Sequence, residues 1–265
     1  MSGALEVKDV RVRFHRSGQE PVVAVDGVSL TVPAAGAVGL VGESGCGKST
    51  LARVIAGIQR PDEGEVSLDG ELLQPRRTRQ QYRAVQLVFQ DPYSSLNPRR
   101  TIRSVLRELL KVHGLSNGTA ADRRCAELME LVGLPLAALD RRPSTFSGGQ
   151  RQRLAIARAL AVEPSVIVAD EPVSALDVSI QATILELFAR LREELGVGLL
   201  LISHNLAVVR QLCDEVAVMY RGQIVELGER EQIFVSPQHS YTQTLLNAVP
   251  RLGGGTEPVS TGGQQ

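Results

Sequence analysis

A glycine-rich segment near the start of the chain has the residue types and spacing of a phosphate-binding loop. Its pattern, GxxxxGK[ST] followed by a threonine, is formed by Gly42, Glu43, Ser44, Gly45, Cys46, Gly47, Lys48, Ser49 and Thr50. Glycines let successive backbone N–H groups curve around a phosphate, and a following helix points its positive end at it. The ammonium of Lys48 would reach the β- and γ-phosphates of a nucleotide, and the hydroxyl of Ser49 would ligate Mg²⁺.

The alternative for this segment is a glycine-rich turn that binds nothing. The apolar run Val38 to Val41 predicts a strand before the segment, and the apolar spacing after it predicts a helix. Only three lysines occur in the chain, and one of them falls at the position that the chemistry requires. This context favours the phosphate loop.

A pair of carboxylates follows an apolar run later in the chain. The run Val166 to Ala169 predicts a buried strand, and Asp170 and Glu171 come directly after it. Ligands of open α/β folds bind at the carboxyl edge of the sheet, which is where such residues lie. Asp170 could hold Mg²⁺ through water, and Glu171 could orient or deprotonate the water that attacks the γ-phosphate. A solvated helix cap is the alternative for the pair by itself.

A third segment, FSGGQRQR at residues 146–153, resembles the signature of ABC-type ATPases, whose common form is LSGGQ. Other motifs of that family stand in the expected order along the chain. Gln90 resembles the glutamine of the Q-loop, and residues 174–177 resemble the D-loop. His204 resembles the switch histidine, and Phe14 stands where the family has the aromatic residue that stacks on adenine. The resemblance covers residues 4 to about 235.

The resemblance implies Mg²⁺-dependent hydrolysis of ATP that is clamped between two subunits. In that family the signature of one subunit closes over ATP on the phosphate loop of its partner, so two ATP molecules lie head to tail. Besides the phosphate loop, the residues implied to contact nucleotide are Phe14, Ser147, Gly149, Gln150 and Asp177. The implied catalytic residues are Glu171, His204, Gln90 and Lys48. The implied Mg²⁺ ligands are Ser49, Gln90 and Asp170.

The apolar pattern predicts where the elements that position these residues lie. Besides the two runs named above, strands are expected over 5–14, 22–32, 65–68, 85–89, 197–202 and 216–219, with turns at 26–27 and 69–70. Leu51, Val54, Ile55 and Ile58 fall on one side of a helix. Between residues 101 and 142 the pattern is helical, and Thr119 or Asp122 is the expected N-cap of the second helix there.

The expected fold is α/β: a P-loop ATPase core of the ABC type with an antiparallel β subdomain and an inserted helical subdomain. We expect one nucleotide-binding domain over residues 1–250, with the helical subdomain at about 100–160. Residues 251–265, rich in Gly, Thr, Ser and Gln, are expected to be a disordered tail.

Composition limits the classes of function. Lys and Arg together number 29, and Asp and Glu together also number 29, so the formal net charge is zero. A zero net charge argues against a broad basic surface that binds nucleic acid. No apolar stretch reaches the roughly 18 residues that a membrane span needs, and the N-terminus lacks the basic start and apolar run expected of a signal peptide. The three cysteines form no CxxC pair and are expected to be buried or partly buried thiols rather than metal ligands. These features favour the cytosol, and the family resemblance implies a peripheral location at the cytoplasmic face of the membrane.

Three further segments resemble the peptide and nickel importer branch of the family. They are QDPYSSLNPR at 90–99, SALDVSIQATIL at 174–185 and PQHSYTQTLL at 237–246, which contains Tyr241. Ser144 and Thr145 depart from the His-Glu of that branch, which leaves partner specificity open. The expected partners are a second ATPase subunit, identical or different, two membrane permeases, and indirectly an extracytoplasmic solute-binding protein. Residues 101–142 and 90–97 are the expected docking surface.

Two other classes of function are disfavoured by the sequence. A soluble ABC ATPase without a transport role typically carries two cassettes or a long coiled-coil insertion, whereas this chain has one cassette and about 40 inserted helical residues. A regulatory module that binds ATP without cleaving it is disfavoured because Glu171, His204 and Gln90 are all present. The cargo, whether dipeptide, oligopeptide or nickel, stays open.

Overall fold

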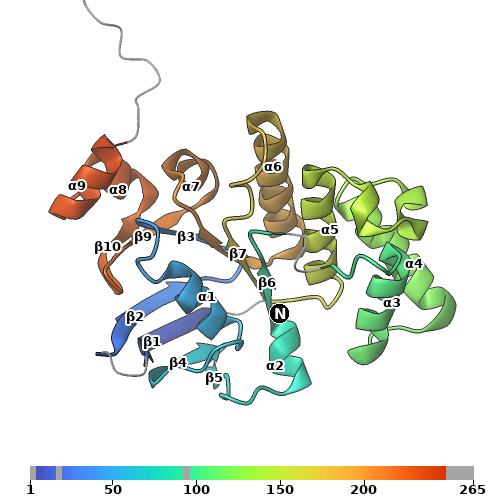
Figure 1. The fold of residues 1–265 in the computed structure, drawn as a ribbon, viewed down its shortest axis with the longest axis horizontal. Coiled ribbons are helices and arrows are strands. Elements are labelled where there is room, and N and C mark those ends of the chain that lie inside the picture. Colours follow the sequence, from blue (N-terminus) through green and yellow to red (C-terminus); the bar gives the residue numbers. More distant parts are fainter. Residues whose placement is uncertain (1–3, 16–19, 92–95, 249–265) are drawn as a thin grey trace, which may run out of the picture.

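Two β-sheets and a set of helices organise the part of the chain that the computed structural model describes, residues 4–15, 20–91 and 96–248 (Figure 1). The smaller sheet is antiparallel, in the order β2-β1-β4-β5, and its strands are β1 Leu5–Phe14, β2 Val22–Val32, β4 Glu63–Leu68 and β5 Glu71–Leu72. The larger sheet has the order β10-β9-β3-β8-β7-β6. Its strands are β3 Ala37–Val41, β6 Val85–Val88, β7 Val166–Asp170, β8 Gly198–Ile202, β9 Glu215–Tyr220 and β10 Gln223–Glu229.

The core of the larger sheet is parallel and buried on both faces. Strand β3 pairs in parallel with β8 and β9, and β7 pairs in parallel with β6 and β8. Along β7, Ile167 and Ala169 join one apolar cluster, whereas Val166 and Val168 join the other. Burial on both faces explains why these strands are continuous apolar runs in the sequence. The carboxyl ends of the parallel strands therefore meet at one edge, where a site can form.

The helices lie on both sides of this sheet and beyond one end of it (Figure 1). They are α1 Lys48–Ile55, α2 Arg79–Ala84, α3 Ile102–Val112, α4 Gly118–Leu131, α5 Gly148–Leu160, α6 Val178–Leu195, α7 Leu206–Leu212, α8 Arg230–Val235 and α9 Ser240–Asn247. Short 3-10 turns, η2 Leu136–Asp140 and η3 Pro143–Thr145, connect α4 to α5. In the described residues, no helix is long and apolar enough to cross a membrane. The predicted α/β fold class is confirmed.

Three local predictions were wrong. Asp26 and Gly27 do not end a strand: β2 continues through them, and they form a bulge opposite β1 with Gly27 at φ 67°. Helix α1 ends at Ile55, so Ile58 is exposed in the turn that follows. The N-cap of α4 is Asn117, so the predicted caps Thr119 and Asp122 lie inside the helix, where Asp122 pairs with arginines of α3. The expected disordered tail, residues 251–265, lies outside the described residues.

Candidate active site

The phosphate loop runs from the end of β3 into α1, and neighbouring strands press against two of its glycines. Gly42 and Gly47 have φ values of 151° and 112°. A Cβ atom at Gly42 would lie 2.1 Å from the carbonyl oxygen of Met219, and one at Gly47 would lie 2.1 Å from that of Ala24. Only glycine fits at both positions. Strands β9 and β2 therefore fix the course of the loop.

Lys48 is held inside this loop. Its side chain is 5% exposed, and its ammonium donates hydrogen bonds of 2.7 Å to the carbonyl oxygens of Gly42 and Glu43. The Sγ atom of Cys46 lies 3.7 Å from the same nitrogen. In the described part of the chain, these partners are carbonyl and sulfur atoms rather than carboxylates. The positive charge therefore keeps its capacity to bind an anion at the start of α1.

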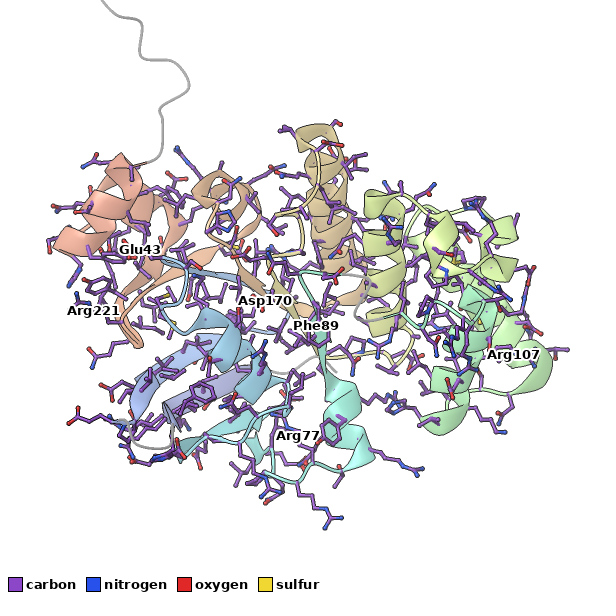
Figure 2. All side chains as sticks on the ribbon, viewed as in Figure 1. Glu43, Arg77, Phe89, Arg107, Asp170 and Arg221 are labelled. Carbon is purple, nitrogen blue, oxygen red and sulfur yellow. The ribbon has the colours of Figure 1, made fainter. Side chains whose placement is uncertain are left out.

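Ser49 and Asp170 bring two oxygen donors together beside Lys48. The Ser49 hydroxyl donates a hydrogen bond of 3.2 Å to Oδ1 of Asp170, which lies at the end of β7 in the centre of the molecule (Figure 2). Burial raises the pKa of the Asp170 carboxyl above its ordinary value, and the hydrogen bond from Ser49 opposes that rise. Hydroxyl and carboxylate oxygens are the donors that Mg²⁺ prefers, and the buried carboxylate gains from a nearby cation.

This donor pair fits Mg²⁺ better than a metal ion whose ligands must all come from the protein. No group of three or more His, Cys, Asp or Glu side chains within the described residues could hold a metal ion. Mg²⁺ is usually bound by one or two protein oxygens, with phosphate and water completing its shell. The pair formed by Ser49 and Asp170 matches that arrangement.

Glu171 is the centre of a hydrogen-bonded group contributed by three strand ends. Its Oε2 accepts a hydrogen bond of 3.2 Å from Nε2 of Gln90, which follows β6, and its Oε1 lies 3.0 Å from Nδ1 of His204, which follows β8. The Glu171 backbone N–H donates to the carbonyl of Ile202 at 2.9 Å, and the residue adopts φ 48°. A positive φ is unfavourable for glutamate, and such backbone strain clusters at functional sites. The structure thus brings Gln90, Glu171 and His204 together.

The signature segment forms the start of α5 and bonds to itself. Ser147 is the N-cap: its hydroxyl accepts the N–H of Gln150 at 3.4 Å, and its own N–H donates to Oε1 of Gln150 at 3.1 Å. Gly149 is covered by α6, since a Cβ there would lie 2.4 Å from Cγ2 of Ile180. The segment presents a helix N-terminus, which favours an anion. Helices α1 and α5, which follow the phosphate loop and the signature, lie apart in Figure 1.

Two predicted contact residues lie outside these groups. Phe14 ends β1, pairs with Val22 and is 41% exposed. Two residues after Val22 comes Ala24, whose carbonyl borders the phosphate loop, so Phe14 lies on the hairpin next to that loop. Asp177 is the exposed N-cap of α6, and its side chain makes no capping bond.

Two residues contact the site although neither is among the predicted catalytic, nucleotide-contacting or Mg²⁺-binding residues. Ser174 accepts a hydrogen bond of 3.3 Å from Gln90 and donates one of 3.1 Å to the Glu171 carbonyl. Its place three residues after Glu171 could have indicated this contact. Tyr241 accepts a hydrogen bond of 3.1 Å from the backbone N–H of Glu43, 198 residues away. No spacing rule links positions so far apart.

Comparisons with known proteins show the family of this chain. The family described as ABC transporter matches residues 25–174, and the one described as oligopeptide/dipeptide transporter, C-terminal region, matches residues 225–265. The oligopeptide transport ATP-binding protein OppF of Lactococcus lactis is 45% identical over 261 residues, 95% of this chain and 82% of that protein. The dipeptide transport ATP-binding protein DppF of Haemophilus influenzae is 48% identical over 236 residues, covering 88% and 72%.

Solved structures show the same architecture. The cbiO1 protein of Clostridium perfringens, described as part of an ABC transporter complex, superposes with a TM-score of 0.76 at 25% identity, covering 88% of this chain and 90% of that one. The ATP-binding cassette MJ0796, in a dimeric form bound to ADP and Pi, gives 0.75 at 30% identity, covering 85% and 98%. Fold and site together define a phosphate-loop ATPase. The chain belongs to the ABC transporter family.

Proposed function

We propose that this chain is the ATP-binding and ATP-hydrolysing subunit of an ABC importer for dipeptides or oligopeptides. One observation carries the cargo class: a single chain matches both the transporter cassette, over 25–174, and the oligopeptide/dipeptide C-terminal region, over 225–265. Relatives that are 45% to 48% identical are named as oligopeptide or dipeptide transport ATP-binding proteins. Nickel, which the sequence left open, has no comparable support, and neither has a soluble role without transport.

In the proposed mechanism, the phosphate loop binds the β- and γ-phosphates of ATP. The backbone N–H groups at the start of α1 and the Lys48 ammonium, already turned into the loop, supply positive potential there. Phe14 stacks on the adenine ring from the neighbouring hairpin. Ser49 and Asp170, with Gln90, would hold Mg²⁺, which would supply positive charge against the charge that develops on the phosphates. Little covalent chemistry is then left to the protein beyond positioning and charge stabilisation.

Glu171 acts on the attacking water in this proposal. Its carboxylate accepts hydrogen bonds, so it can orient a water molecule and take up a proton from it. His204 and Gln90, which contact the two oxygens of that carboxylate at 3.0 Å and 3.2 Å, fix its orientation. The family resemblance implies that His204 also contacts the γ-phosphate.

The proposed assembly contains two ATPase subunits, two membrane permeases and, indirectly, an extracytoplasmic solute-binding protein. Ser147, Gly149, Gln150 and Asp177 act across the dimer on ATP bound to the partner. The chain docks on the cytoplasmic side of the permeases through residues 101–142 and 90–97, of which 92–95 lie outside the described residues. The dimeric forms of the solved cassette MJ0796 support this arrangement.

The test is transport by the complete complex. The chain, its permeases and the solute-binding protein are reconstituted in liposomes, and ATP-driven uptake of a labelled dipeptide, a labelled pentapeptide and Ni²⁺ is measured. A matched complex carrying Glu171→Gln controls for uptake that does not need hydrolysis. We expect peptide uptake only in the wild-type complex. Uptake of Ni²⁺ without peptide, or hydrolysis that peptide-loaded binding protein does not stimulate, would contradict the proposed cargo.

A further inference from the structure

The C-terminal helix α9 touches the phosphate loop through one tyrosine. The Tyr241 hydroxyl accepts the backbone N–H of Glu43 at 3.1 Å. Figure 2 places Glu43 beside α8 and α9, in agreement with this contact. Tyr241 belongs to the segment 237–246, which the proposed mechanism leaves without a role. A contact between this segment and the ATP site needs a functional explanation.

The peptide unit between Gly42 and Glu43 takes part in two hydrogen bonds, one with Tyr241 through its N–H and one with Lys48 through its carbonyl oxygen. The unit between Gly42 and Glu43 contributes its N–H to Tyr241 and its carbonyl oxygen to the Lys48 ammonium, at 2.7 Å. Hydrogen bonds that share a peptide unit polarise one another, so donation to the hydroxyl makes the carbonyl a better acceptor. Tyr241 thus acts on the atom that positions Lys48, although it does not touch Lys48.

Tyr241 is itself fixed on two sides. Its ring lies on that of Tyr220, at the end of β9, with ring centroids 4.2 Å apart. Its backbone N–H donates to Nδ1 of His239 at 3.1 Å. The backbone N–H of His239 in turn donates to the Glu226 carboxylate of β10 at 3.1 Å, and that of Gln238 donates to the same carboxylate at 2.7 Å. The hydroxyl therefore reaches the loop from a rigid support rather than from a mobile side chain.

The ionisation state of Tyr241 suits this contact. Burial raises the pKa of the phenol above its ordinary value, so the hydroxyl stays protonated at neutral pH. A neutral hydroxyl oxygen accepts one N–H without adding a negative charge next to the phosphates. The contact is therefore compatible with bound ATP.

We propose that Tyr241 is a positioning residue of the phosphate loop: its hydroxyl holds the peptide unit between Gly42 and Glu43 in the orientation that receives Lys48. The C-terminal region is then part of the nucleotide site. The proposal rests on the ATP site described above and does not depend on the cargo.

The test compares two tyrosines of the same ring pair. Tyr241→Phe removes the hydroxyl that contacts the loop and keeps the ring, and Tyr220→Phe removes a hydroxyl from the neighbouring ring, which has no hydrogen bond to the loop in the described residues. Both are made in the full chain carrying Glu171→Gln, so that ATP with Mg²⁺ can be titrated without turnover. Amide hydrogen exchange of the loop and thermal unfolding midpoints are recorded for each variant.

We expect Tyr241→Phe to raise the Kd for ATP about threefold to tenfold, the usual size of one lost hydrogen bond. Exchange at the Glu43 amide should become faster, while the unfolding midpoints of both variants stay close to that of the parent. In the background with Glu171 intact, KM for ATP should rise and kcat should stay unchanged. Tyr220→Phe should leave Kd, KM and loop exchange unchanged.

Two results would overturn the proposal. The first is an unchanged Kd in Tyr241→Phe, and the second is an equal loss of affinity in Tyr220→Phe, which would assign the effect to the ring pair instead of the hydroxyl. Failure of the parent chain to bind ATP is a distinct result, because it would contradict the ATP site itself. Binding by the parent together with no effect of Tyr241→Phe would contradict only the positioning role.

Discussion

The two anion sites of this chain differ in how complete they are. At the phosphate loop, side chains from several segments already bond to one another: Ser49 to Asp170, and Gln90 and His204 to Glu171. At the signature, the Ser147 hydroxyl and the Gln150 side chain each accept the other residue's backbone N–H at the start of their own helix. The first site is assembled from segments that are far apart in the sequence, whereas the second consists of one helix N-terminus.

This difference is explained by the sheet. The carboxyl ends of β3, β6, β7 and β8 meet at one edge, so residues far apart in sequence become neighbours there. The signature begins a helix that lies beyond the end of the sheet, away from α1 (Figure 1). A single chain therefore brings the phosphate loop and the Glu171 group together, while the signature lies apart from them. In our account a second subunit supplies the signature.

The largest expected effect concerns the hydrolytic group. Glu171→Gln keeps the size and hydrogen bonding of the side chain but removes its capacity to take up a proton, so hydrolysis should fall about 10²- to 10⁴-fold. Binding of ATP should be retained, because the phosphate loop is unchanged. Phosphate release at saturating ATP and an ATP titration measure the two quantities. Hydrolysis at the wild-type rate would remove Glu171 from the catalytic role.

The next effect concerns the loop itself. Lys48→Ala removes the cation that Gly42 and Glu43 hold in place, and one charge-assisted hydrogen bond corresponds to about a 10- to 100-fold loss of ATP affinity. Ser147→Ala in a single chain should leave that affinity unchanged if, as we propose, the signature acts on the partner's ATP. Equal losses in both variants would show that the two sites are not separate within one chain.

The smallest effect concerns stability. Because burial raises the pKa of Asp170, the folded state disfavours its ionised form. Stability contributed by the protonated carboxyl is complete below the unfolded pKa, near 4, and is lost as pH rises through the folded pKa. Asp170→Asn, which stays neutral, should therefore raise the Tm of the ATP-free chain at pH 7.5 more than at pH 4, while Mg²⁺-dependent hydrolysis falls. A Tm at pH 7.5 equal to or below that of the wild type would contradict this reasoning.

Local patterns were sufficient for the parts of the site that one segment encodes. The loop from Gly42 to Thr50 and the carboxylates that end β7 follow from spacing, because a strand, a turn and a helix there are neighbours in sequence. Asp26 and Gly27 have the residue types of a turn, and only pairing with β1 makes them a bulge. The contact of Tyr241 with Glu43 depends on how β9, β10 and α9 fold back onto the loop, which no local pattern carries.

The most direct test of the shared site mixes two inactive chains. Lys48→Ala destroys the phosphate loop and Ser147→Arg blocks the signature, so each variant alone should be inactive in either arrangement. If ATP is clamped between chains, a mixed dimer has one intact site out of two. About half of the dimers in an equimolar mixture are mixed, so the mixture should recover about a quarter of the wild-type rate measured under the same conditions. A mixture that stays inactive while the wild-type chain hydrolyses ATP would show that the phosphate loop and the signature act within one chain.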